Sequence, residues 1–228
     1  MTAPPVIAPD PLGSLPAIVR WLMERCKPEP DALELVTPNA TLESLYATWM
    51  EKKFFSSAIR LIAAVLPPRE SIWWAWVSAR HATQMVGGRA PTATQHTALG
   101  HIERWIIRPD EETRRVAWES ANAAGLDTPI GMVGTAVFLS GVSVGPANTP
   151  PVPPPPRAIV PIIPGAILLA ASLNTKPELI EPTMVAFATQ GLEVVKRLGG
   201  WDAAVKTAHE QQLRAEQDYA RAIQPPTR

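Results

Sequence analysis

Apolar residues recur three and four positions apart along most of the chain, the spacing of one face of an α-helix. No stretch alternates apolar and polar residues as a half-buried β-strand would. Prolines and paired glycines separate the periodic stretches. The expected helices cover residues 14–26, 41–49, 54–66, 68 to the glycines at 87–88, 91–108, 109–124, 129–140, 165–173, 177–198 and 201–223. The pattern predicts an all-α fold, a single multi-helix bundle.

Helix ends can be predicted from capping residues and prolines. Ser14 and Thr128 are expected to cap helices, and Pro68 suits a first helical turn because that position needs no N–H donor. A helix is expected to propagate cleanly only after Pro164, and the helix that Pro177 opens is expected to kink or restart at Pro182.

The predicted core is rich in tryptophan, of which the chain has 8. In the segment 68–80 the residues Trp73, Trp76 and Arg80 follow a helical spacing, and Trp74 widens that apolar face. A guanidinium on such a face needs a partner, and Glu70 or an acid of the helix beginning near Asp110 is expected to pair with Arg80. The residues assigned to the core are Ile59, Ile62, Trp73, Trp74, Trp76, Arg80, Trp105, Trp118, Leu168 and Leu169.

The helical domain is expected to cover residues 13–200, and three segments are expected to contribute little to its core. Two of them flank the domain: a proline-containing N-terminal arm, residues 1–12, and a charged C-terminal helix and tail, residues 201–228. Within the domain, a proline-rich connector at 145–157 is expected to be extended polyproline II. The last helix shows a thin apolar seam of Val205, Ala208, Leu213 and Tyr219.

Net charge and cysteine content narrow the possible functions. The 21 basic and 21 acidic residues balance, which argues against a nucleic-acid partner. One cysteine, Cys26, and no secretory signal pattern favour a reducing, cytoplasmic location. Arg157 is the sole charge between Thr128 and Thr175, so a membrane hairpin is the alternative, but its apolar segments are short or broken by proline.

Catalytic and metal-binding motifs are lacking. The sequence has no phosphate-binding loop, nucleophile elbow or His-Glu-x-x-His motif, and His96 and His101 are five residues apart, off the four-residue spacing of a metal pair. Asp110, Glu111 and Glu112 with Arg114 and Arg115 suit an ordinary exposed helix, acids first and bases later. We therefore expect no enzyme activity, no metal and no cofactor.

Six segments of the chain carry a resemblance to a known family, and they are 68–80, 105–115, 124–129, 138–146, 153–157 and 166–171. Together they resemble an uncharacterised family of helical bacterial proteins, often encoded beside type VI secretion genes for spike and PAAR-tip proteins. The chain differs from that pattern at Trp76, where the family usually has a small or Cys-like residue, and in its charged C-terminal helix.

The resemblance implies a non-catalytic adaptor or chaperone-like factor that binds a spike, PAAR-tip or effector protein. An immunity protein for a secreted toxin is the rival within such a locus. A stiff proline-rich segment loses little conformational entropy on docking, so the connector and the last helix are the expected contact surfaces. The candidate protein-binding residues are Pro151, Pro153, Pro154, Pro155, Pro156, Arg157, Trp201, Leu213 and Tyr219.

Overall fold

The computed structural model describes residues 12–84 and 90–223. These ranges contain α-helices and one 3-10 helix, η1, and no strand, which confirms the all-α prediction. The helices are α1 (Ala17–Cys26), α2 (Pro30–Leu33), α3 (Leu42–Glu51), α4 (Phe55–Val65), α5 (Pro68–Ala82), α6 (Ala93–Ile107), α7 (Glu111–Ala124), α8 (Pro129–Leu139), α9 (Ile162–Ser172), η1 (Pro177–Leu179), α10 (Ile180–Arg197) and α11 (Trp201–Ile223).

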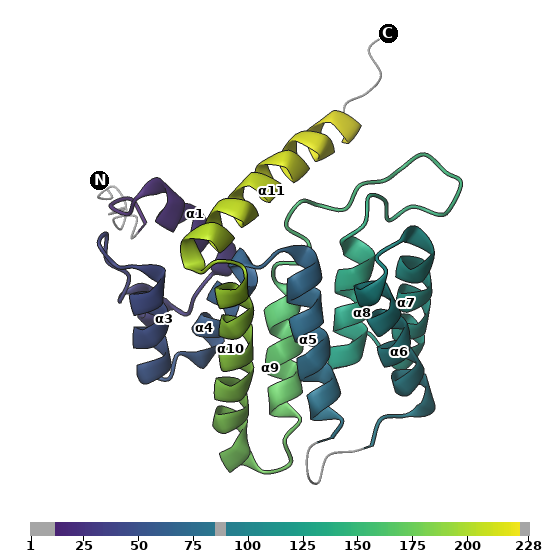
Figure 1. The fold of residues 1–228 in the computed structure, drawn as a ribbon, viewed down its shortest axis with the longest axis horizontal. Helices are drawn as coiled ribbons and strands as arrows, with labels where there is room; N and C mark the ends of the chain where they lie inside the picture. Colours follow the sequence, from purple (N-terminus) through teal and green to yellow (C-terminus); the bar gives the residue numbers. More distant parts are fainter. Residues whose placement is uncertain (1–11, 85–89, 224–228) are drawn as a thin grey trace, which may run out of the picture.

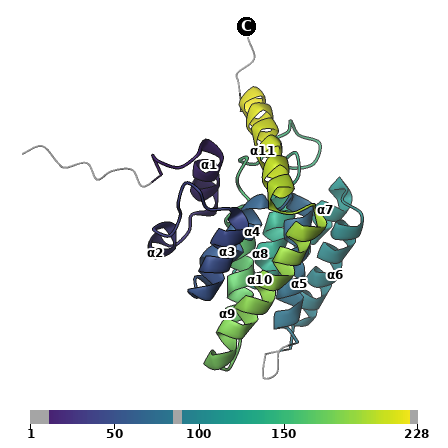
Figure 2. The ribbon, with the colours of Figure 1, turned by 60° about the vertical axis from the view of Figure 1, so that its left-hand side comes forward.

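The helices form a bundle with an end layer. Helices α10, α9, α5 and α8 stand side by side, with α6 and α7 packed beyond α8 and α4 against α10 and α9 (Figure 1). Helix α11 crosses obliquely over one end of this bundle, close to α1, as a second view also shows (Figure 2). The connector between α8 and α9 loops out at the same end. One end of the bundle therefore gathers the three elements α1, α11 and the connector.

Helix α5 occupies the centre because four helices, α6, α8, α9 and α10, pack around it. Trp74 is completely buried, and its indole N–H donates to the carbonyl of Phe187 at 2.9 Å. The indole N–H of Trp76 donates to the carbonyl of Leu99 at 3.0 Å. Trp73 is partly buried at the edge of the core. The core assignment is thus right for Trp74 and Trp76, whereas Trp73 is only partly buried, so Trp74 anchors α5.

The remaining core predictions are right for three residues and only partly right for three others. Ile59, Ile62 and Trp105 are buried as predicted. Trp118, Leu168 and Leu169 are partly buried, since α7, α8 and α9 approach one another through small residues instead. Ala117 and Ala121 of α7, for example, lie against Gly134 of α8. The ring of Trp118 stacks on Phe138 with centroids 4.7 Å apart.

Arg80 departs from the predicted core role. Its side chain is exposed, and its guanidinium lies over the Trp76 ring, 5.3 Å from the centroid. Within residues 12–84 and 90–223 no carboxylate pairs with Arg80, so the predicted ion pair with Glu70 or an acid near Asp110 is wrong. The residue sits in the last turn of α5, where its charge reaches water while its stem covers an aromatic ring.

The prolines place several helix starts differently from the prediction. Pro68 and Pro129 begin α5 and α8 as predicted, and the Thr128 hydroxyl accepts from the N–H of Gly131. Pro164, however, lies within the first turn of α9, which begins at Ile162. Pro182 likewise lies in the first turn of α10, and the change from η1 to α10 comes at Ile180, before this proline. A first turn tolerates proline because its N–H has no helical acceptor.

Two further helix predictions near the N-terminus need correction. Helix α1 begins after Pro16 with no side-chain cap, so Ser14 is not its N-cap, and the short helix α2 was not predicted. The glycine stop at 87–88 and residues 1–11 of the N-terminal arm lie outside the described residues. Cys26 is buried at the end of α1, and burial raises the pKa of its thiol to about 12.

Candidate functional site: a connector groove and an end-layer cleft

An apolar groove of about 480 Å³ lies between the connector and the C-terminal half of α11. We call it the connector groove. Its lining residues are Pro68, Leu139, Ser140, Gly141, Val142, Pro151, Pro153, Pro154, Pro155, Pro156, Ala158, Ile159, Ala215, Asp218, Tyr219 and Ala222. Among them only Asp218 is charged, and it pairs with Arg221. Val142 is 81% exposed. The structure thus brings five predicted prolines and Tyr219 to one surface.

The other predicted binding residues lie elsewhere. Trp201 is buried against Tyr46, with ring centroids 5.8 Å apart, and Leu213 is exposed on a different side of α11 from Tyr219. The predicted apolar seam is wrong at Leu213, because the buried position in that turn is Gln212. Arg157 forms an ion pair with Glu216 of α11 at 3.2 Å. Trp201 therefore anchors α11 and is not an accessible contact residue.

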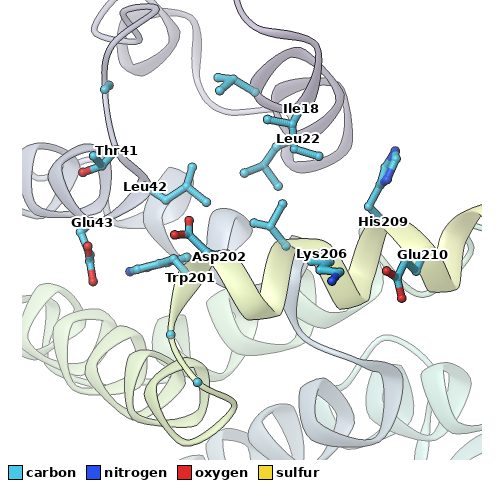
Figure 3. Close-up of a pocket in the computed structure, with 15 residues that line it drawn as sticks. Ile18, Leu22, Thr41, Leu42, Glu43, Trp201, Asp202, Lys206, His209 and Glu210 are labelled. Carbon is cyan, nitrogen blue, oxygen red and sulfur yellow. The ribbon is translucent and has the colours of Figure 1, made fainter.

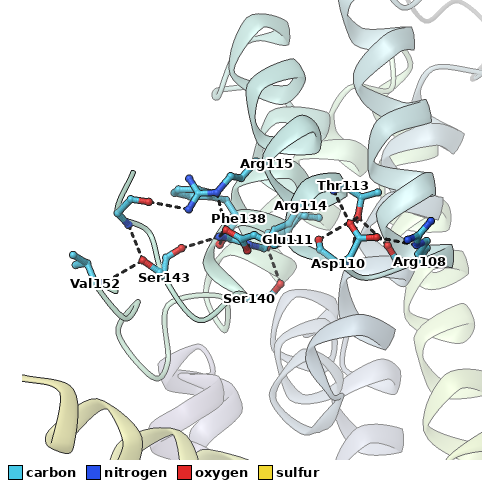
Figure 4. Close-up of polar contacts among 12 residues, drawn as sticks. Arg108, Asp110, Glu111, Thr113, Arg114, Arg115, Phe138, Ser140, Ser143 and Val152 are labelled. Atoms are coloured by element: carbon cyan, nitrogen blue, oxygen red, sulfur yellow. Dashed lines mark hydrogen bonds and ion pairs between the residues drawn. The ribbon is translucent and has the colours of Figure 1, made fainter. Parts of the chain in front are cut away.

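The connector is fastened at its root by Arg114 of α7 (Figure 4). This side chain is 2% exposed and makes a bidentate ion pair with Glu111, with both N–O distances 2.8 Å. It also donates to the carbonyl oxygens of Phe138 and Ser143, the latter at 2.8 Å. The interpretation of this cluster as an ordinary exposed helix surface is therefore wrong for Arg114. Spacing along the helix placed acids and bases one turn apart, but it did not indicate the distant carbonyls.

Arg115 and the connector itself complete this anchor. Arg115 donates to the carbonyl of Gly145 at 2.9 Å and pairs with Glu111 at 2.6 Å. The Ser143 hydroxyl accepts from the backbone N–H groups of Gly145 and Val152, and the N–H of Val144 donates to the carbonyl of Val152 at 2.7 Å. These bonds close the loop 143–152. Residues 151–155, at the end of the loop and just after it, are neither helix nor strand, as their composition predicts.

The charge environment stabilises this anchor in its ionised form. Hydrogen bonds from Arg114, and then from Arg115, lower the pKa of Glu111 below its ordinary value. Asp110 caps α7 by accepting the N–H of Thr113 at 2.8 Å, and that bond lowers the pKa of Asp110. Glu111 is therefore the ionised centre of a two-arginine cluster.

A second polar network docks α11. Arg25 of α1 donates to the carbonyl of Ala64 at 2.7 Å and to the side-chain oxygen of Gln212. Gln212 in turn donates to Glu216 at 2.7 Å, and Glu216 pairs with Arg157. Burial, followed by the nearby charge of Arg157, lowers the pKa of Arg25 to about 10. The network joins α1, α4, α11 and the connector.

A larger cleft of about 630 Å³ opens on another side of α11, between α1, the start of α3 and the first turns of α11. We call it the end-layer cleft. Figure 3 shows Ile18 and Leu22 of α1 facing α11, with Asp202 and Lys206 projecting from that helix. Its lining residues are Ile18, Val19, Leu22, Ala40, Thr41, Leu42, Glu43, Gly199, Gly200, Trp201, Asp202, Val205, Lys206, His209 and Glu210. Sequence periodicity could not reveal it, because its walls are over 150 residues apart in the chain.

Both sites combine apolar side chains with a few charged ones. Among the described residues no group of three or more His, Cys, Asp or Glu side chains could hold a metal ion. In that same part of the chain, no helix is long and apolar enough to cross a membrane, and α8 and α9 have 11 residues each.

Fold and site together define an all-α helical bundle with an anchored proline-rich connector beside an apolar groove. The chain belongs to a family of unknown function (DUF6931), whose model matches residues 45–195. No curated protein and no solved structure matches the chain. The match includes the connector wall of the groove, whereas α1 and α11 lie outside it.

Proposed function

We propose that this chain is a non-catalytic protein-binding accessory factor, an adaptor or chaperone-like component of a type VI secretion locus acting in the cytoplasm. Its partner would be a spike, PAAR-tip or effector protein. The sequence resemblance supports the link to a type VI secretion locus, and the connector groove supports a role in binding a protein. The bound segment would be apolar and uncharged, because the sole charge lining the groove already has a partner in Arg221.

The observation that carries the proposal is the convergence of the connector and α11. Five prolines and Tyr219, expected at contact surfaces from separate features of the sequence, line one groove. The loop that leads to the prolines is held by Arg114 and Arg115, so the wall of the groove is set before a partner arrives. Preorganisation of this kind lowers the entropic cost of docking.

Exposed apolar side chains extend this surface. Val142 is 81% exposed at the groove, and Val152 in the anchored loop is 51% exposed. Exposed apolar side chains that gather on one surface are typical of protein contacts. The same surface offers no charged patch suited to a nucleic acid.

Copurification from the native host tests the proposal. A tagged full-length chain should enrich a spike, PAAR-tip or effector protein, identified by mass spectrometry. Replacing Val142 by Asp should abolish that enrichment by placing a charge in the apolar contact. The matched control is Ile107→Asp on α6, since Ile107 is 72% exposed and does not line the groove.

Three outcomes would contradict parts of the proposal. Absence of any secretion component from the enriched proteins would exclude the adaptor role. Equal enrichment by Val142→Asp and the wild type would exclude the groove as the contact surface. Enrichment of a toxin whose activity the purified chain inhibits would favour the immunity role instead.

A further inference from the structure

The end-layer cleft and the connector groove are lined by different parts of the chain. Every residue that lines it belongs to 18–43 or 199–210, outside the segment 45–195 that the family model matches. The connector wall of the groove lies within that segment. The cleft is therefore built from the two chain extensions, α1 with the turn before α3 at one end and α11 at the other.

The chemistry of the cleft is amphipathic. Its apolar floor is formed by Ile18, Val19, Leu22, Leu42 and Val205, of which Ile18 is 41% exposed. An isoleucine on a surface helix with that exposure, facing an open cleft, offers apolar area for an incoming side chain (Figure 3). The cleft is large enough for several side chains, within the range of roughly 300–1,000 Å³ typical of ligand sites.

The rim of the cleft is acidic. The carboxylates of Glu43, Asp202 and Glu210 stand against the single ammonium group of Lys206. Asp202, Lys206 and Glu210 are four residues apart on α11, yet no ion pair links them in the part of the chain that the structure describes. The rim thus carries a net negative charge on groups that face solvent.

We infer that the end-layer cleft binds an amphipathic segment of a partner protein, with apolar side chains on the floor and lysine or arginine residues at the rim. Charge complementarity selects this partner, because an acidic rim attracts basic side chains and repels phosphate groups of nucleic acids or lipids. The residues of this contact lie outside the segment that the family model matches. The inference does not depend on the connector groove, which lies on another side of α11.

Fluorescence anisotropy with the full chain tests the inference. The probe is a fluorescein-labelled 14-residue helical peptide with leucine on one face and lysine on the other, and its counterpart carries glutamate in place of lysine. The lysine peptide should bind, the glutamate peptide should not, and added salt should weaken binding. Replacing both Asp202 and Glu210 by Lys should lower the affinity for the lysine peptide at least about tenfold, because the net charge of the rim then changes sign.

A matched control separates local recognition from net charge. The double variant Glu103→Lys and Glu119→Lys changes the total charge equally, at exposed acids of α6 and α7 outside the cleft. It should leave the affinity within about twofold of the wild type. Ile18→Asp should weaken binding as strongly as the rim reversal, whereas Val142→Asp in the connector groove should have no effect.

Two results would overturn the inference. Equal loss of affinity in the rim variant and its charge-matched control would show attraction by net charge alone. The second result has two parts: the full chain binds neither peptide, and a chain without residues 1–11 binds both with equal affinity. It would identify the chain's own N-terminal segment as the occupant of the cleft.

Discussion

The interior of the bundle and its end layer differ in how much polar contacts contribute to each. Around α5, buried apolar side chains from α6, α8, α9 and α10 pack together, and Trp74 is completely enclosed. At the end of the bundle, buried apolar side chains such as Trp201 are accompanied by polar contacts: those of Arg25 link α1 to α11, and those of Arg114 fasten the connector to α7. Apolar burial is non-directional, but these hydrogen bonds require particular geometries. The end layer is thus the part whose arrangement single polar changes should alter.

The largest expected effect is in the interior. Trp74→Ala should lower the free energy of unfolding by about 3–5 kcal/mol, because it empties a large enclosed volume and removes the bond to Phe187. Trp73→Ala is the matched control one residue away, and its cost should be about 1–2 kcal/mol since that ring is partly buried. Urea denaturation followed by circular dichroism measures both. Equal losses would contradict the assignment of Trp74 as the anchor.

A glycine pair tests how tightly the interior is packed. A Cβ at Gly191 of α10 would lie 2.6 Å from the Trp74 ring and 2.9 Å from Ile62, so Gly191→Ala should cost about 1–3 kcal/mol. A Cβ at Gly100 of α6 would meet nothing within 4 Å. Gly100→Ala should therefore stabilise the protein by up to about 1 kcal/mol through helix propensity. Thermal denaturation of both variants measures these changes in stability. A stabilising effect of Gly191→Ala would show that the interior is loosely packed there.

The connector anchor should respond to loss of Arg114. Arg114→Leu leaves the carbonyls of Phe138 and Ser143 without this donor, at a cost of about 1–3 kcal/mol. Hydrogen exchange should become faster at the amides of Val144 and Val152 in the anchored loop. Arg115→Ala, the neighbouring control, removes one carbonyl bond and should have a smaller effect. Unchanged exchange in Arg114→Leu would mean that the loop is held by other contacts.

The smallest expected effect is a pH dependence. Because the pKa of Glu111 is lowered in the fold, its contribution is complete above its unfolded pKa of about 4.3 and is lost as pH falls through the folded pKa. The difference in stability between wild type and Glu111→Gln should therefore narrow below about pH 4, by under about 1 kcal/mol since this carboxylate is half-exposed. Denaturation midpoints from pH 7 to pH 3 measure it. A difference that widens on acidification would contradict the assignment.

The sequence predicts the interior better than the end layer, for physical reasons. Apolar periodicity locates the buried helix 54–66 and the tryptophan-rich helix after Pro68, because burial depends on which face is apolar. Within that helix the periodicity placed Trp73 on the buried face and Trp74 at its margin, whereas Trp74 is the more buried residue. Four helices surround this one, so its apolar spacing alone does not show which side is most deeply buried. Arg114 was assigned to solvent because its carbonyl partners, 24 and 29 residues along the chain, have no side-chain signature.

The candidate sites were predicted in part. Proline content located one wall of the connector groove and Tyr219 the other, but not that they meet. Leu213 was misplaced because its neighbour Gln212 takes the buried position through a hydrogen bond with Arg25, which hydrophobicity does not report. The end-layer cleft joins two distant extensions of the chain and has no sequence signal of its own.

The single cysteine has a practical consequence for labelling experiments. Cys26 is enclosed at the end of α1 and, with its thiol pKa raised to about 12, is almost entirely protonated at neutral pH. A maleimide dye should therefore ignore the native thiol and react with one introduced at Val142 or Ile18, which are exposed. The chain thus accepts a fluorophore at either site without prior removal of a cysteine, so partner contact at the groove and at the cleft can be observed separately.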